Sequence, residues 1–188
     1  MRKAICLVLL TIMGLSSLTF GSPSVGAEER RCTGRIGATT VDNVRVPSGR
    51  SCTLEGTRVK GSVYVSGGGT LRVVSARIVG NIQSEGHSYV RVSGSTTVGG
   101  SIQLKQGGAF SIDSARVTGS IQVTSNSGRS KIARNSVNAD IQVFLHSGGI
   151  AIGSNRVDGN LQCKENSPRP TGSGNIVQGN KEDQCRRL

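Results

Sequence analysis

Residues 98–104 read VGGSIQL and residues 117–123 read VTGSIQV, and this seven-residue phrase recurs along most of the chain. The other copies are VKGSVYV at 59–65, IVGNIQS at 78–84, VNADIQV at 137–143, VDGNLQC at 157–163 and VQGNKED at 177–183. Their third residue, a glycine in every copy but one, falls at positions 61, 80, 100, 119, 139, 159 and 179. A period of about 20 residues indicates a solenoid, in which each turn buries its apolar face against the next.

Alternation of apolar and polar residues predicts that the phrase forms a β-strand. In the copy at 117–123, Val117, Ile121 and Val123 share one face, whereas Gln122 lies on the other. From turn to turn the apolar residues form two columns of mostly β-branched side chains, as a buried strand face prefers. These columns are Val59, Ile78, Val98, Val117, Val137, Val157 and Val63, Ile82, Ile102, Ile121, Ile141, Leu161.

A second strand is predicted in each turn, with the inward column Leu54, Val73, Val92, Ile112, Ile132, Ile152. Glycine-rich turns such as 66–69 and 147–149 separate the strands and permit a positive φ. Parallel strands joined by crossovers are almost always right-handed. The sequence therefore predicts an all-β fold, a right-handed parallel β-helix with about 20 residues per turn and seven to eight turns.

Residues 1–27 differ in composition from the rest and are typical of a secretory signal peptide. Arg2 and Lys3 precede an apolar run from Ala4 to Leu18, and small residues at 25–27 provide a cleavage site. A retained membrane anchor is the alternative, but the run is short for a membrane span, and no later segment resembles one. We therefore expect two parts, the signal peptide (1–27) and a β-helix domain (28–188), with no transmembrane segment after cleavage.

Four cysteines follow the signal peptide, and their spacing predicts two disulfides that cap the ends of the solenoid. Cys52 follows Cys32 by one period of the repeat, and Cys185 follows Cys163 by slightly more than one period. Residues one turn apart lie about 4.8 Å from each other, and a disulfide requires a Cα separation of about 4.4 to 6.8 Å. Other connectivities exist, but the period favours Cys32–Cys52 and Cys163–Cys185. Metal binding is the alternative, although neither histidine lies near a cysteine pair.

The chain is basic, with 23 Lys and Arg residues, 11 Asp and Glu residues and a formal net charge of +12. Two of the basic residues lie in the signal peptide, so residues 28–188 carry a charge of +10. Such a surface favours polyanions, and outside the cell these include anionic polysaccharides. We expect no specific binding of nucleic acid. The alternative is that the charge mainly gives solubility.

Two outward columns are the candidate ligand-binding residues. Arginines recur at one position of the turn, and a row of guanidinium groups suits the carboxylate, phosphate or sulfate groups of a polymer. Glutamines recur at another position, where their amides either form a structural ladder or offer donors and acceptors to a glycan. The alternative role for the arginines is that of solvated corner residues, spaced to limit repulsion. The proposed residues are Arg58, Arg77, Arg116, Arg156 and Gln83, Gln103, Gln122, Gln142.

The acidic residues that could serve in catalysis are scattered along the sequence. The acidic residues Asp113, Asp140, Asp158 and Glu85 fall in different turns and columns, although Asp140 and Asp158 come from neighbouring turns. Calcium sites and acid/base pairs require several carboxylates close together. We therefore predict a non-enzymatic protein without a cofactor, a catalytic residue or a metal site.

The segments VDNVRVPSGRSCTLEGTRVKGSV (41–63) and NLQCKENSPRPTGSGNIVQGNKEDQC (160–185) resemble an uncharacterised family of small secreted bacterial proteins. This resemblance implies a secreted β-solenoid and brings no known activity. The V-x-G-x-I repeat is also similar to that of bactofilins, cytoskeletal β-helices that polymerise end to end. The chain departs from bactofilins through its signal peptide and its cysteine- and proline-bearing ends.

The sequence thus predicts a binding module for an anionic cell-surface or extracellular polymer, located outside the cell, in the periplasm or on the cell surface. A structural or self-associating envelope protein is the alternative, and a polysaccharide lyase or hydrolase is the third reading. The oligomeric state does not follow from the sequence.

Overall fold

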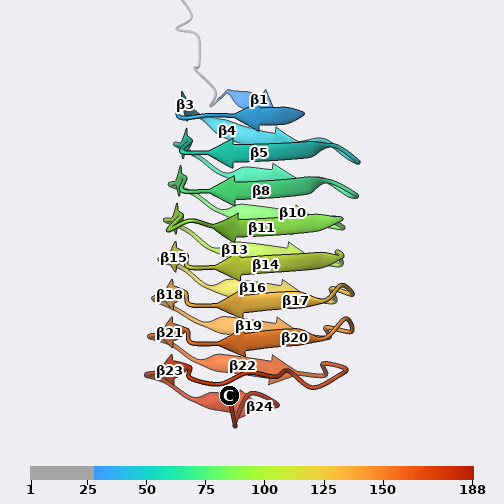
Figure 1. Cartoon of the computed structure of the whole chain (residues 1–188), viewed down its shortest axis with the longest axis vertical. Helices are drawn as coiled ribbons and strands as arrows, with labels where there is room; N and C mark the ends of the chain where they lie inside the picture. Colours follow the sequence, from blue (N-terminus) through green and yellow to red (C-terminus); the bar gives the residue numbers. More distant parts are fainter. Residues whose placement is uncertain (1–27) are drawn as a thin grey trace, which may run out of the picture.

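The computed structural model describes residues 28–188, and the predicted signal peptide lies outside the described residues. Within the described part, 24 strands form three parallel sheets, and no residue is helical. It therefore contains no helix that could cross a membrane. The chain visits the three sheets in the same order in every turn but the last, which adds no strand to sheet B, and this gives a three-sided solenoid of about eight turns (Figure 1).

Sheet A contains β1 (Glu29–Arg31), β4 (Asn43–Val46), β7 (Val63–Val65), β10 (Ile82–Glu85), β13 (Ile102–Lys105), β16 (Ile121–Thr124), β19 (Ile141–Phe144), β22 (Leu161–Lys164) and β24 (Lys181–Asp183). Sheet B contains β2 (Gly34–Ile36), β5 (Ser51–Glu55), β8 (Thr70–Val74), β11 (Tyr89–Ser93), β14 (Ala109–Asp113), β17 (Ser130–Ala133) and β20 (Ile150–Gly153). Sheet C contains β3 (Thr40–Val41), β6 (Arg58–Val59), β9 (Arg77–Ile78), β12 (Thr97–Val98), β15 (Arg116–Val117), β18 (Ser136–Val137), β21 (Arg156–Val157) and β23 (Ile176–Val177).

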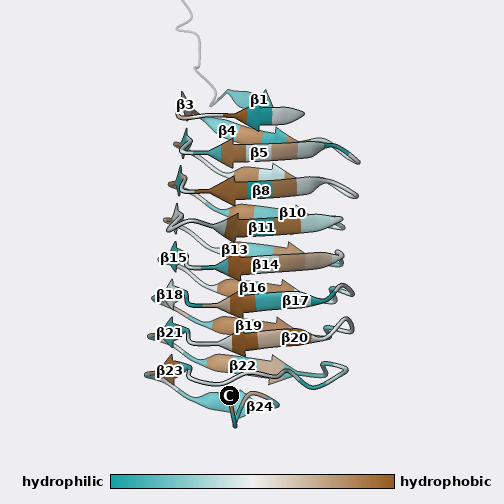
Figure 2. Ribbon diagram, in the orientation of Figure 1, coloured by the Kyte–Doolittle hydropathy of each residue, from teal (hydrophilic) through white to brown (hydrophobic). Residues whose placement is uncertain are grey.

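The predicted right-handed β-helix is confirmed. In Figure 1 the chain descends from β1 to β24, with the strands of sheet B in front pointing left and those of sheet A behind pointing right. Strand register places each predicted apolar column in line, for example Ile102 beside Ile121 in sheet A and Val98 beside Val117 in sheet C. The columns are buried and form one continuous core, and brown segments recur at corresponding positions of successive strands in Figure 2.

The prediction that the repeated phrase is one strand is wrong, because the phrase crosses a corner. Val117 ends β15 in sheet C, and Ile121 begins β16 in sheet A, so each turn has three strands rather than two. Both side chains point into the core from different sides of the solenoid. Alternation of apolar residues therefore continues through the corner and conceals it from the sequence.

The glycine of the phrase makes room for a hydrogen-bonded column at this corner. In each turn an Asn, Ser or Asp side chain accepts a hydrogen bond from the backbone N–H of its counterpart one turn later, as Asn81 does from Ser101 at 2.8 Å. A Cβ at Gly100 would lie 2.2 Å from Asn81 Oδ1. Where Ala139 replaces the glycine, the bond from Asp140 N to Ser120 Oγ lengthens to 3.3 Å. Close stacking, rather than a positive φ, selects glycine here.

Both predicted disulfides are present, one at each end of the stack. The Cα–Cα distances are 5.5 Å for Cys32–Cys52 and 5.1 Å for Cys163–Cys185. Each bridge runs diagonally between turns, because the register partner of Cys52 is Gly34 and that of Cys163 is Asp183. The spacing near one period identified the pairs, although the bonded residues are not directly above each other.

The C-terminal end departs from the repeat. Lys181 takes the place in sheet A that Leu161 holds one turn earlier, and its ammonium group donates to a backbone oxygen of Leu188. Residues 168–172 form no strand and add to sheet B only an isolated bridge between Ala151 and Thr171. Lysine and irregular backbone at a sheet edge hinder the addition of a further strand.

Candidate functional site

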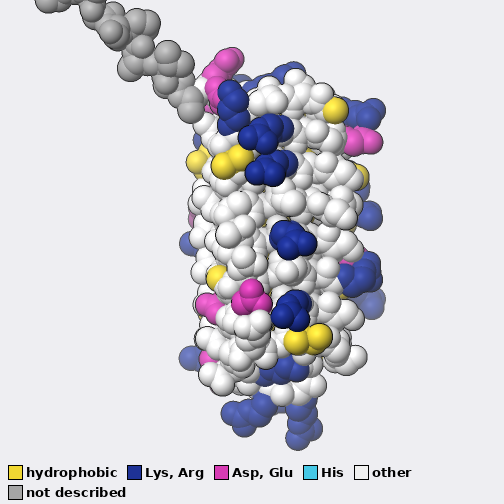
Figure 3. Space-filling view, turned by 90° about the vertical axis from the view of Figure 1, so that its left-hand side faces the viewer, with side chains coloured by type: hydrophobic (Ala, Val, Ile, Leu, Met, Phe, Trp, Pro, Cys, Tyr) yellow, Lys and Arg dark blue, Asp and Glu magenta, His cyan; other side chains and the backbone are white. Residues whose placement is uncertain are grey.

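Sheet C carries the predicted arginine column on its outer face. Strand pairing aligns Arg58 with Arg77, and then Thr97, Arg116, Ser136 and Arg156 follow one per turn. All four arginines are exposed. At about 4.8 Å per turn the column extends over about 24 Å. Figure 3 shows a file of basic side chains running down this face of the molecule.

None of the four arginines forms an ion pair with another residue of the described chain. The neighbouring outward column contains two acidic residues: Asp158, which directly follows β21, and Asp42, which follows β3 and pairs with Lys60 at 3.2 Å. The column therefore offers guanidinium groups whose hydrogen-bond donors are available to a ligand.

A second basic column lies on sheet B and was not singled out from the sequence. Its members in register are Arg35, Arg72, Arg91 and Lys131, with Thr53 and Ser111 between them. Unlike the column on sheet C, it is partly neutralised. Arg35 pairs with Glu55 at 2.6 Å, and Lys131 pairs with Asp113 at 3.0 Å. The sequence signal was available, because Arg91 follows Arg72 by one period of the repeat.

Asp113 shows how local charge acts on this second column. Partial burial raises the pKa of its carboxyl, but hydrogen bonds from Lys131 and Ser114 and the charges of Lys131 and Arg134 outweigh burial and leave the pKa lowered. The carboxylate is thus kept ionised between two cations, which reduces what this part of sheet B can offer an anionic ligand.

Small residues between the arginines hollow the face of sheet C. Arg77 and Arg116 line a pocket of about 250 Å³ together with Val79, Thr97 and Gly99. Val79 is 46% exposed. Two residues that carry guanidinium groups thus line this pocket.

The glutamine column on sheet A forms the structural ladder that was one of its two predicted roles. Each amide NH₂ donates to the amide oxygen of the next turn, with distances of 2.8, 2.9, 3.0 and 2.9 Å from Gln83 through Gln103, Gln122 and Gln142 to Gln162. Gln162 donates to Glu182 at 2.9 Å. Gln103, Gln122 and Gln142 therefore each give one donor and one acceptor to the ladder.

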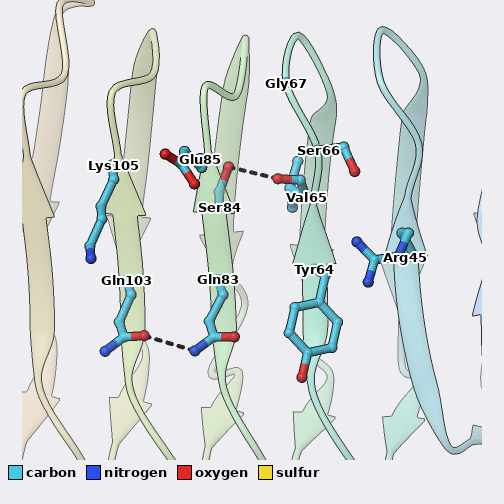
Figure 4. Close-up of a pocket in the computed structure, with 10 residues that line it drawn as sticks. All are labelled: Arg45, Tyr64, Val65, Ser66, Gly67, Gln83, Ser84, Glu85, Gln103 and Lys105. Atoms are coloured by element: carbon cyan, nitrogen blue, oxygen red, sulfur yellow. Dashed lines mark hydrogen bonds between the residues drawn. The ribbon is translucent and has the colours of Figure 1, made fainter.

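The N-terminal end of this ladder opens into a groove of about 570 Å³ on the outer face of sheet A (Figure 4). Its walls come from β4, β7, β10 and β13 and from the turn after β7. The side chains combine an aromatic ring, amides, hydroxyls and charges of both signs: Arg45, Tyr64, Ser66, Gln83, Glu85 and Lys105. The sequence signal was Tyr64, which stands where later turns have glutamine.

The acidic residues and histidines are not brought together. The carboxylate of Asp140 accepts a hydrogen bond from Asn160 N at 2.7 Å in the corner column, and Asp158 is exposed on the outward side of sheet C. His87 and His146 are buried in different turns. Residues 28–188 contain no group of three or more His, Cys, Asp or Glu side chains placed to hold a metal ion.

Comparisons of this chain with models of protein families, with curated proteins and with solved structures find no match.

Proposed function

We propose that this protein is an exported β-solenoid that binds an anionic polymer along the arginine column of sheet C, without catalysing a reaction. The observation that carries the proposal is the alignment of Arg58, Arg77, Arg116 and Arg156 on one exposed face with no carboxylate paired to any of them in residues 28–188. A polymer with repeated carboxylate, sulfate or phosphate groups would contact several guanidinium groups in series.

The disulfides support the cellular location in this proposal. Disulfides persist in oxidising compartments, such as the periplasm or the extracellular space. Cys32–Cys52 and Cys163–Cys185 together with the composition of residues 1–27 fit an exported protein.

The test removes the four guanidinium groups together. Replacing Arg58, Arg77, Arg116 and Arg156 with Ser should lower the affinity for heparin at 0.15 M salt by about 100-fold, from about 0.7 kcal/mol for each exposed charge contact. The salt concentration that elutes the protein from a heparin column should fall as well, because such contacts are screened by salt.

A matched control separates the column from net charge. Replacing Arg72, Arg91, Arg186 and Arg187 with Ser removes the same charge from exposed positions outside sheet C. This variant should lose less than about 5-fold in affinity, which is about 1 kcal/mol. Equal losses in both variants, or retention of full affinity by the first, would refute the proposal. A concentration-dependent oligomer that heparin does not retain would favour the structural role instead.

A further inference from the structure

We propose that the groove on sheet A is a second binding site, which accepts a pyranose ring of a neutral glycan. The site lies on a different face from the arginine column, and it does not depend on the polyanion proposal. Its volume of about 570 Å³ falls within the range of small-molecule pockets, about 300 to 1,000 Å³.

The first wall of the groove is an aromatic ring held in place by charged neighbours. The guanidinium of Arg45 lies over the ring of Tyr64, 5.2 Å from its centroid. Arg45 is itself fixed by Glu29, with 2.7 Å between Nε and Oε1, and the same hydrogen bond lowers the pKa of Glu29. Figure 4 shows Tyr64 between Arg45 and Gln83. A ring positioned in this way offers flat apolar surface beside polar groups.

The second feature of the groove is the first residue of the glutamine ladder, whose amide oxygen receives no hydrogen bond from the ladder. All the ladder bonds run in the same direction, from the NH₂ of one turn to the oxygen of the next, and they end at the carboxylate of Glu182. Aligned hydrogen bonds polarise one another. Gln83 Oε1 begins the series and accepts no hydrogen bond from residues 28–188, so the groove presents an acceptor that a ligand can use.

The opposite wall supplies charges of both signs. Glu85 and Lys105 are register partners on β10 and β13 at the rim of the groove, and neither belongs to an ion pair in the described chain. A ligand in the groove can therefore donate to Gln83 and Glu85 and accept from Lys105. Hydroxyl groups do both, and a ring with several neighbouring hydroxyls and a flat C–H face matches this set of contacts together with Tyr64.

The floor of the groove is held by hydrogen bonds between buried residues. Ser84 Oγ donates to Val65 O at 3.2 Å and lies 3.1 Å from His87 Nδ1, and both Ser84 and His87 are buried. Because the floor is held by these contacts and the wall by Glu29 and Arg45, the site needs little rearrangement to bind.

The test uses an array of neutral pyranose glycans, probed with the purified protein in 0.5 M NaCl to screen the arginine column. The wild type should bind at least one glycan, and Tyr64→Ala should weaken that binding about tenfold, as expected for the loss of an aromatic contact. Gln83→Leu should cause a similar loss, whereas Gln83→Glu, which keeps an acceptor oxygen at this position, should retain binding.

Tyr89→Ala is the matched control. Tyr89 is on sheet B, where Arg72 lies 5.4 Å from the centroid of its ring, so it reproduces the arginine–tyrosine pair away from the groove. This variant and the fourfold arginine variant should bind the glycan like the wild type. Failure of the wild type to bind any neutral glycan, or equal losses for Tyr64→Ala and Tyr89→Ala, overturns the groove proposal and leaves the heparin result unaffected.

Discussion

Two buried histidines at the corner between sheets A and B lack part of their hydrogen bonding. His87 is 2% exposed, and its Nε2 has no partner. His146 is 1% exposed; its Nε2 lies 3.2 Å from Gly149 O, and its Nδ1 has no partner. Burial lowers the pKa of His87 from 6.5 to about 4 and also lowers that of His146. Both residues therefore remain neutral in the folded protein near pH 7.

The lowered pKa values of the two histidines predict that the folded protein loses stability in acid. Above pH 6.5 His87 is neutral in both states, but between pH 6.5 and about 4 only the unfolded chain takes up the proton, so stability falls as the pH falls. The shift of the His87 pKa from 6.5 to about 4 corresponds to a loss of about 3 kcal/mol in the free energy of unfolding. Urea unfolding at pH 7.5, 5 and 4 measures the loss.

His87→Asn is the control for this loss, because Asn126 and Asn166 occupy the same corner in later turns. The variant should lose about 3 kcal/mol less than the wild type over this pH range. An identical pH dependence in both proteins would show that His87 does not titrate with the predicted shift.

At the scale of elements, the solenoid contains two ladders of amide side chains that differ in burial. Asn135, Asn155 and Asn175 stack inside the corner between sheets B and C, whereas the glutamines lie half-exposed on sheet A. Asn155 Oδ1 accepts from both the backbone N and Nδ2 of Asn135 at 3.0 Å, and its Nδ2 donates to Ile132 O at 3.0 Å. A buried polar group that loses its hydrogen-bond partner destabilises the fold, whereas a solvent-accessible group can bond to water instead.

We therefore expect unequal costs from removing one member of each ladder. Asn155→Ala leaves buried backbone and amide groups of the adjacent turns without partners and should lower the free energy of unfolding by about 3 kcal/mol. Gln122→Ala should cost about 1 kcal/mol, because water replaces the lost partners. Chemical denaturation of the two variants measures both values, and equal costs would contradict the role assigned to burial.

The inward-facing positions could be predicted from the sequence, but the number of strands in each turn could not. The regular period aligned the inward columns correctly, since register in a solenoid follows the repeat. The corner inside the phrase was missed because Val117 and Ile121 both face the core across it. The groove on sheet A was missed because its properties arise from neighbours in space, such as Arg45 over Tyr64, which come from successive turns of the solenoid.

At the scale of the whole molecule, each turn packs only on its neighbours, so the terminal turns have one packing partner instead of two (Figure 1). The disulfide-bonded cysteines at the two ends are buried, with Cys163 and Cys185 at 0% exposure. A disulfide that closes a loop of about one turn stabilises by about 3 kcal/mol. The bridges thus lie where a linear stack would otherwise begin to open.

Each disulfide should protect only its own end of the solenoid. Replacing Cys32 and Cys52 with Ala should speed amide hydrogen exchange in β1 to β3 and leave β22 and β24 as protected as in the wild type. Replacing Cys163 and Cys185 should do the reverse, and in both variants the central strands β10 to β19 should stay protected, because each retains neighbours on both sides. Exchange followed by mass spectrometry on the two variants, each serving as the control for the other, measures this. If either replacement speeds exchange evenly along all turns, the solenoid opens as one cooperative unit, and the bridges stabilise the whole stack rather than its ends.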